Sequence, residues 1–285
     1  MVKVVISDLV HYPVKSLRAV NSPSLKMSSM GLYDDRRWMV VDHQGDFLSQ
    51  RQLPKMAILS ASVNSDGLLL RSDAQFGSGR QIAVQRPADT DTSCRMAVTV
   101  WGNQCQGVLV DDQVNQWLSN ELERPCRLVY MPMTTSRLVQ GFADNRVGFA
   151  DGYPLLLTSQ ASLQALNLRL KNKNQVAVTM DRFRPNLVIE GDSALEPFAE
   201  DQWASLTLGN LRLINARACG RCMVVNTDQA SGVRHADREP LATLREFRMD
   251  SEDEICFGIN LVPELINGAA EAIIRPGDRL EVEWK

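Results

Sequence analysis

The chain has 285 residues, of which 44% are hydrophobic and 23% charged, and its formal net charge is −3. These values are typical of a soluble globular protein with one large domain or two ordinary ones, and they give no electrostatic footprint for nucleic acid or an anionic membrane. No apolar run approaches the about 20 residues that span a bilayer, and early charges at Lys3 and Asp8 argue against a secretory signal. Since there are six cysteines and no export signal, we expect reduced thiols and a cytoplasmic location.

Short β-type segments separated by turn residues dominate the first part of the sequence. A turn at 43–46 separates the β-type runs 37–41 and 47–49 and predicts a β-hairpin. The turn signal Gly102-Asn103 joins the last two of the further strands that the pattern predicts, at 68–70, 82–84, 96–100 and 107–110.

Two segments carry the periodicity of an amphipathic helix. The first, 114–122, places its apolar residues on one stripe and follows capping aspartates at 111–112. The second, 161–170, has leucines on one face and follows the capping residues Thr158 and Ser159. We therefore expect two helices at these places.

Strands return toward the C-terminus. The runs 205–208 and 211–214 bracket a turn at 209–210, and two more β-type runs, 272–275 and 280–283, end the chain. Many short strands with few helices predict a mainly β fold of the α+β class with a closed or sandwiched sheet. A weakly periodic segment at 131–145 is the expected connection between an N-terminal and a C-terminal region.

The sequence contains a lone C-x-x-C, formed by Cys219 and Cys222, with Arg221 inside it. Structural zinc needs four ligands, and the sequence has no second pair of cysteines or histidines that could complete such a site. Because a guanidinium favours the thiolate form, a reactive or metal-bound thiolate is the preferred interpretation. A zinc half-site completed by another chain and two ordinary buried thiols are the alternatives. A thioredoxin-like site is excluded, because 223–225 reads as a continuing strand.

Several polar groups could bind an anion such as phosphate. Lys15 and Ser16 follow a strand that ends at Pro13, and they offer an ammonium, a hydroxyl and turn N–H groups. Arg36 and Arg51 add guanidinium groups. Each of these residues is equally compatible with an ordinary solvated loop or sheet surface.

Two further segments have the same character. Arg182 and Arg184 point the same way if their segment is extended, and Asn186 adds an amide, so together they suit a phosphate or a polar heterocycle. The helix start at Thr158 and Ser159 offers N–H groups and a positive dipole end. An ordinary turn and a plain helix cap are the simpler interpretations.

Taken together, these motifs run in a fixed order along nearly the whole chain. They resemble the MOSC family of molybdenum-cofactor proteins, which includes bacterial YcbX-like proteins and the mitochondrial amidoxime reducing component. The resemblance is carried by segments 12–16, 31–38, 51–54, 150–159, 182–186, 218–222 and 238–244.

The resemblance implies a fold and a site. It implies a β-barrel-like MOSC N-terminal domain over 1–125 and a MOSC β-barrel domain over 126–285. It implies molybdenum held by a pterin dithiolene and by Cys222, which would be both the metal ligand and a catalytic residue, with Asp151 near the metal as a proton relay. Arg221 would tune the thiolate or secure the cofactor. The positions that would hold the pterin and its phosphate are Lys15, Ser16, Arg36, Thr158, Ser159, Arg184 and Asn186.

The function implied by the resemblance is a molybdenum oxidoreductase that reduces N-hydroxylated compounds such as hydroxylamines, amidoximes and N-hydroxylated bases, a detoxification activity. The chain lacks the C-x4-C-x2-C spacing of a plant-type iron–sulfur domain. We therefore expect electrons from a separate flavoprotein or 2Fe–2S ferredoxin-type reductase, and a shortened version of a longer protein is the alternative. One alternative is a carrier of molybdenum cofactor, or of sulfur as a Cys222 persulfide. Another is a non-enzymatic β-barrel adaptor. We expect no nucleic-acid or membrane partner.

Overall fold

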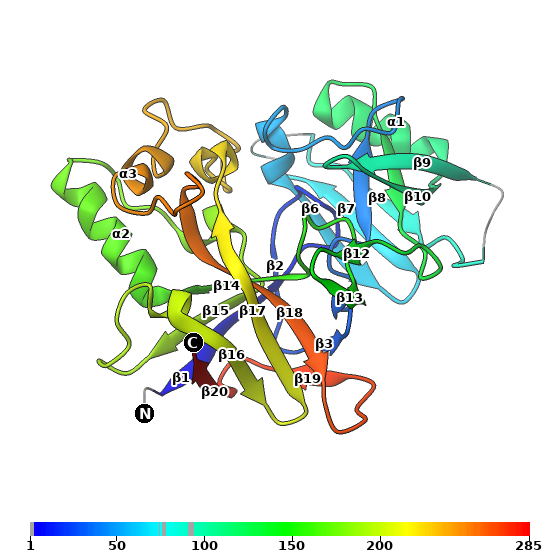
Figure 1. Cartoon of the computed structure of the whole chain (residues 1–285). Helices are drawn as coiled ribbons and strands as arrows, with labels where there is room; N and C mark the ends of the chain where they lie inside the picture. The colour runs from blue at the N-terminus through cyan, green and yellow to red at the C-terminus, as the bar shows by residue number, and fades with distance from the viewer. Residues whose placement is uncertain (1–2, 74, 76–77, 91–93) are drawn as a thin grey trace.

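The structure is a computed structural model that describes residues 3–73, 75, 78–90 and 94–285. It is mainly β, with three α-helices in the described part of the chain (Figure 1). The prediction of a mainly β fold with a few helices and a closed sheet is thus confirmed. None of the helices in these residues is long and apolar enough to cross a membrane.

The larger body is a seven-stranded barrel, closed because its first and last strands pair with each other. Only β14 and β15 run parallel among the pairs that form it, and helix α2 (Gln160–Asn172) connects them. In barrel order the strands are β15 (Leu187–Gly191), β14 (Leu155–Ser159), β18 (Cys256–Leu265), β17 (Leu211–Gly220), β16 (Trp203–Leu208), β20 (Arg279–Trp284) and β1 (Val4–His11).

The N-terminal strand β1 closes this barrel. It pairs with β15 on one side and β20 on the other, so the first and last strands of the chain lie side by side (Figure 1). The first half of the strand alternates buried apolar residues with less buried ones, the register shifts between Ile6 and Asp8, and Val4, Ile6 and Leu9 pack into the barrel core with Trp203 and Leu261. The boundary between residues 125 and 126 remains a prediction, and the barrel takes one strand from before it.

The second body holds most of the N-terminal half, at the upper right of Figure 1. Two sheets share a core centred on the fully buried Trp38, and helix α1 (Asp112–Leu122) packs into it through Leu118. One sheet has the order β5 (Trp38–Val41), β11 (Arg127–Tyr130), β10 (Asn103–Leu109), β9 (Arg95–Val100), and the other β6 (Leu59–Asn64), β7 (Gly67–Ser72), β8 (Gln81–Gln85).

Short strands connect the two bodies. The C-terminal strand β19 (Ala272–Ile274) pairs with β3 (Leu25–Ser28), and β3 pairs with β4 (Gly31–Leu32). The expected connection at 131–145 contains most of a small hairpin of its own. The remaining short strands are β2 (Val20–Asn21), which pairs with β1, and the hairpin strands β12 (Leu138–Val139) and β13 (Phe142–Arg146).

The predicted helices are confirmed with their caps. Asp111 Oδ1 accepts hydrogen bonds from the backbone N–H groups of Gln113 (2.7 Å) and Val114 (3.2 Å) at the start of α1. Ser159 Oγ accepts from the N–H of Ser162 over 3.1 Å at the start of α2. Caps of this kind satisfy N–H groups that have no partner inside the helix.

One local prediction was wrong. Residues 223–225 do not continue a strand, because β17 ends at Gly220 and Cys222 precedes the 3₁₀ helix η4 (Met223–Asn226). The C-x-x-C therefore lies at a junction between a strand and a short helix. The other helical segments of the described chain are α3 (Leu241–Arg245), η1 (Pro54–Ile58), η2 (Met180–Phe183) and η3 (Ala199–Gln202).

Candidate functional site

A pocket lies where the barrel meets the N-terminal body, and side chains from both bodies line it. Its volume is about 170 Å³. Eight of the ten residues predicted from the sequence line it, which brings together segments more than 200 residues apart. They are Lys15, Ser16, Arg36, Asp151, Arg184, Asn186, Arg221 and Cys222.

Lys15 and Asp151 form an ion pair that joins the two halves of the chain. The Lys15 side chain is only 7% exposed, and its Nζ donates to Asp151 and, over 2.8 Å, to the carbonyl of Phe149. Burial lowers the pKa of Lys15, although the Asp151 carboxylate opposes that shift. Loss of water raises the pKa of Asp151, but the Lys15 charge and hydrogen bonds outweigh it and hold that pKa well below the usual range. Asp151 is therefore a carboxylate.

Trp101 forms the rim of the pocket, and sequence reasoning missed it. Its indole Nε1 donates to Asp151 Oδ1 over 2.8 Å, and the guanidinium of Arg51 lies 4.1 Å from its ring centroid. Phe47 packs against the same ring at 5.2 Å, yet Trp101 remains 47% exposed. The only sequence signal is a large aromatic residue beside the glycine of a tight turn, where a solvated polar residue is more usual.

Two guanidiniums lie against one buried tyrosine ring. Arg36 and Arg184 lie 4.5 Å and 4.3 Å from the ring centroid of Tyr12, which is fully buried. Burial and the neighbouring Arg36 charge lower the pKa of Arg184 to about 10, although Tyr12 opposes this. Arg36 has its own carboxylate partner, Asp35. In contrast, Arg184 Nη2 is buried and has no hydrogen-bond partner in the described structure, so this group is available to an anionic ligand.

Four residues that line the pocket have left-handed backbone conformations. The φ angles are 69° at Ser16, 48° at Arg36, 50° at Trp101 and 56° at Arg184. Such angles are uncommon for residues other than glycine and are held by the surrounding structure, often at functional sites. They turn the chain sharply where each side chain enters the pocket.

Asn186 organises the centre of the site. It is fully buried, and its Oδ1 accepts from Arg36 Nη1 (3.0 Å) and from the backbone N–H of Leu156 (3.2 Å). Its Nδ2 donates to the carbonyl of Val10 and to Asp35, each over 3.2 Å. All of these groups are satisfied within the protein, so Asn186 positions its neighbours.

The two cysteines of the C-x-x-C have different surroundings. Both are free thiols that line the pocket. Arg221 Nη1 donates to Cys219 Sγ over 3.0 Å, while its Nη2 donates to the carbonyl of Phe183 over 2.6 Å. The arginine within the motif therefore contacts Cys219, and its buried Nε has no partner in the described structure.

Thr158 and Ser159 do not reach the pocket. Both are fully buried and neither lines it. Ser159 caps α2 and also donates to the buried carboxyl group of Glu200, and Thr158 Oγ1 contacts Met180. The simpler interpretation, a plain helix cap, describes what the structure shows for Ser159.

Arg182 and Arg184 diverge instead of pointing the same way. The segment is not extended, because η2 ends at Phe183 and Arg184 is left-handed. Arg182 forms an ion pair with Asp228 at 3.0 Å, away from the pocket, whereas Arg184 lines it. The alternation rule for strands does not hold in a 3₁₀ turn.

Arg137 also supports the site and was missed. Its guanidinium donates to three backbone carbonyls, those of Gly148 (2.9 Å), Ala150 and Asp151. Its sequence surroundings give no signal for this role, because its partners are main-chain groups of a loop. It holds that loop so that Asp151 faces Lys15.

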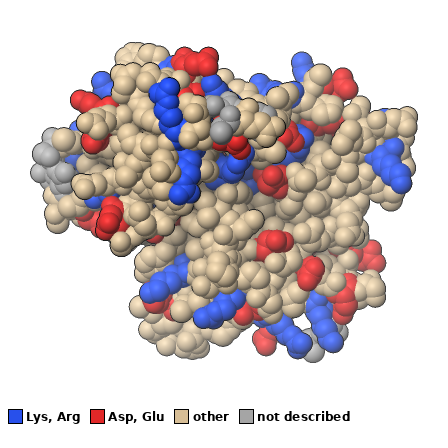
Figure 2. All heavy atoms as spheres, turned by 180° about the vertical axis from the view of Figure 1, so that it is seen from behind, with Lys and Arg blue, Asp and Glu red and all other residues tan. Residues whose placement is uncertain are grey.

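The pocket is cationic within an acidic chain. Five of its lining residues are basic and only Asp151 is acidic, although the chain carries a net charge of −3. On the face shown in Figure 2, acidic and basic residues are interspersed. The basic lining residues are Lys15, Arg36, Arg51, Arg184 and Arg221.

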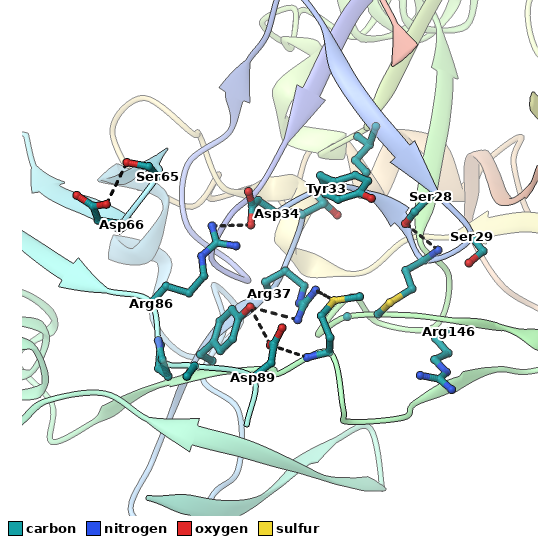
Figure 3. Close-up of a pocket in the computed structure, with 18 of the residues that line it drawn as sticks. Ser28, Ser29, Tyr33, Asp34, Arg37, Ser65, Asp66, Arg86, Asp89 and Arg146 are labelled. Carbon is teal, nitrogen blue, oxygen red and sulfur yellow. Dashed lines mark hydrogen bonds and ion pairs between the residues drawn. The ribbon is translucent and has the colours of Figure 1, made fainter. Parts of the chain in front are cut away.

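A larger cavity of about 1030 Å³ is lined in part by Asp34, Asp35 and Arg37 (Figure 3). None of the predicted site residues lines it. Its charged groups are largely engaged with one another or with the main chain: Arg86 pairs with Asp34 at 2.9 Å, and Asp89 accepts from the N–H of Met133 over 2.8 Å. The smaller, cationic pocket is thus the candidate site.

Comparison with known proteins identifies two domain families in the chain. Residues 3–125 match the MOSC N-terminal beta barrel domain, and residues 144–281 match the MOSC domain. The chain is 34% identical to mitochondrial amidoxime-reducing component 1 of Xenopus laevis, over 96% of this chain and 80% of that protein. The human protein of the same name is 31% identical, over 87% of this chain and 73% of that protein.

A second group of relatives bears a different name. Molybdenum cofactor sulfurase of Oryza sativa subsp. japonica is 30% identical over 94% of this chain, but the match covers only 34% of that protein. The relatives of both groups match at least 87% of this chain, and their names refer either to amidoxime reduction or to the molybdenum cofactor. The chain belongs to the MOSC-domain family of proteins.

Proposed function

We propose that the chain is a molybdenum-cofactor oxidoreductase that reduces N-hydroxylated compounds with electrons from a separate donor protein. The observation that carries the proposal is one pocket in which a cysteine thiol and five cationic side chains converge. The relatives named amidoxime-reducing component support the reaction class.

The residues fit an anionic pterin cofactor. Arg184 Nη2 and Arg221 Nε are buried without partners, and buried donors of this kind call for an acceptor. Cys222 supplies a soft sulfur donor, which molybdenum accepts. The pocket volume of about 170 Å³ is below the about 300–1,000 Å³ of typical ligand pockets, so these side chains would hold only part of such a cofactor.

Each pocket residue has a role that fits its chemical type and its hydrogen-bonding partners. Cys222 would bind the metal, Arg184 and Arg36 would bind the anionic part of the cofactor, and Ser16 would add a hydroxyl and a turn N–H. The bound group supplies the two-electron redox chemistry. Asn186 and Arg137 keep these side chains in place through buried hydrogen bonds.

The overall reaction consumes two electrons and two protons. With them, an N–OH group is converted to an N–H group and one molecule of water. Lys15 and Asp151 are the titratable pair that faces the pocket. The low pKa of Asp151 makes it a poor acid at neutral pH. The lowered pKa of the buried Lys15 makes its ammonium a better proton donor, with Asp151 holding it in position.

The test is expression in a host that makes molybdenum cofactor, followed by metal analysis and turnover of a hydroxylamine with a small artificial reductant. We expect about one molybdenum per chain in the wild type and none in Cys222→Ala. Full activity of a cofactor-loaded Cys222→Ala protein would overturn the mechanism.

A second candidate function follows from the sulfurase relatives. In that case the chain carries molybdenum cofactor, or sulfur as a Cys222 persulfide, for delivery to other enzymes. This carrier function predicts tight cofactor binding, but no reduction of a hydroxylamine when an artificial reductant supplies the electrons. A chain with neither molybdenum nor pterin fluorescence would instead favour the adaptor.

A further inference from the structure

Two buried glutamines lie behind the pocket, where the N-terminal body meets the loop after Cys222. Gln50 is fully buried and Gln229 is 5% exposed. Their amides form a reciprocal pair: Gln50 Nε2 donates to Gln229 Oε1 over 3.0 Å, and Gln229 Nε2 donates to Gln50 Oε1 over 2.9 Å. Neither residue lines the pocket.

The remaining hydrogen bonds of this pair reach the pocket wall. Gln50 Nε2 donates to the carbonyl of Ser16 over 2.8 Å, and Gln229 Oε1 accepts from Arg184 Nη1 over 3.3 Å. Gln229 Nε2 also donates to the carbonyl of Thr227, over 3.1 Å. Thr227 directly follows the short helix that begins after Cys222, so the pair connects Ser16 and Arg184 of the pocket wall with the segment after Cys222.

Two arginine side chains make further hydrogen bonds between this loop and the N-terminal body. Arg234 Nη2 donates to the carbonyls of Gln50 (2.8 Å) and Arg51 (3.0 Å). Arg18 Nη2 donates to the carbonyl of Ala230 over 3.3 Å. The loop after Cys222 is therefore attached to the N-terminal segments that contribute Ser16 and Arg51 to the pocket.

We propose that the Gln50–Gln229 pair is a positioning element that sets the N-terminal side of the pocket against Arg184 and Cys222. The physical reason is directional: apolar contacts tolerate sliding, whereas displacement of either amide would leave buried donors and acceptors unpaired. The inference rests on the proposed function, because the pair would position the pocket side chains to bind the anionic cofactor. Hydrogen-bonding partners behind the direct ligands typically contribute about 10–100-fold to metal affinity or activity.

The test compares Gln50→Met, Gln229→Met and the double variant, since methionine keeps the length and loses the amide. The readout is the dissociation constant of molybdenum, taken from the metal that remains bound over a dilution series. We expect each single variant to weaken retention about 10–100-fold. The double variant should lose less than the product of the two, because neither amide is then left facing an apolar group.

Asn167→Leu provides a matched control. Asn167 also makes two amide hydrogen bonds, to the N–H and the carbonyl of Val178; it is partly buried and does not line the pocket. We expect this variant to lower the melting temperature by a similar amount without loss of molybdenum. Equal loss of metal in the control, or independent losses in the two glutamine variants, would overturn the proposal.

Hydrogen exchange of the cofactor-free proteins separates this inference from the proposed function. The backbone N–H groups of Arg18 and Thr227 bond to Leu59 and Val224 in the wild type. Both should exchange faster in either glutamine variant and at the wild-type rate in Asn167→Leu. A wild type that binds no molybdenum would refute the function alone, whereas unchanged exchange at both amides would refute the positioning role.

Discussion

The guanidinium of Arg221 donates a hydrogen bond to the sulfur of Cys219 over 3.0 Å. This contact distinguishes two cysteines that the sequence presents as a symmetrical pair. Cys219 has a cationic partner within the protein, whereas Cys222 lines the same pocket directly before η4 and accepts no hydrogen bond from Arg221 in the described structure. The two residues should therefore respond differently to substitution.

Cys222→Ser should abolish molybdenum binding, because it removes the soft donor atom, while Cys219→Ser should retain at least about a third of the wild-type metal. Elemental analysis of both purified variants checks this. Since both residues are half-buried at the same pocket, each controls for the effect of the substitution itself. Loss of metal in Cys219→Ser and retention in Cys222→Ser would reverse the assignment.

Ser159→Ala should lower the free energy of unfolding by about 1 kcal/mol, the usual effect of losing a helix cap. Its molybdenum content should equal that of the wild type, because Ser159 is buried against Glu200 and does not line the pocket. Urea unfolding and metal analysis of one preparation check both statements. A stable variant without metal would instead support the role implied by the family resemblance.

Trp101→Ala should widen the pocket at its rim. We expect kcat/KM for a bulky N-hydroxylated substrate to rise relative to that for a small one, by about tenfold or 1.4 kcal/mol. The fold should lose about 1 kcal/mol or less, because Trp101 is half exposed and its contact with Arg51 is a surface one.

Trp284→Ala is the matched control for that prediction. Trp284 is 52% exposed and does not line the pocket, so its loss should leave the ratio of the two substrates unchanged. If both variants shift the ratio equally, or neither does, Trp101 does not select substrates by size.

Stability should fall as the pH drops below about 6.5, the usual pKa of histidine, and His11 should contribute to that fall. Burial lowers the pKa of His11, although the charges of Asp35 and Asp34 partly oppose it. Between the lowered and the usual pKa the unfolded chain binds the proton and the folded chain does not, so acidification favours unfolding.

His11→Gln should remove this contribution. Urea midpoints of both proteins between pH 7.5 and pH 5 provide the measurement, and the difference between the two curves isolates His11 from other titrating groups. Curves that remain parallel over the whole range would contradict the prediction.

The sequence by itself determined the local elements and the chemical character of the site. The two helix caps, each narrowed to a pair of adjacent residues, the hairpin turns and the mainly β class depend on short-range backbone rules, which operate between near neighbours. The functional residue types could also be read, because a thiol and cationic side chains suit a metal and an anionic group wherever they occur.

Only the tertiary structure decided which of those residues share a pocket. The direction of a side chain depends on local backbone geometry, as the divergence of Arg182 and Arg184 shows. Trp101, Arg137 and the Gln50–Gln229 pair act through partners 50, 14 and 179 residues away or through main-chain carbonyls. Such contacts leave no periodic pattern in the sequence, because they depend on which segments the folded chain brings together.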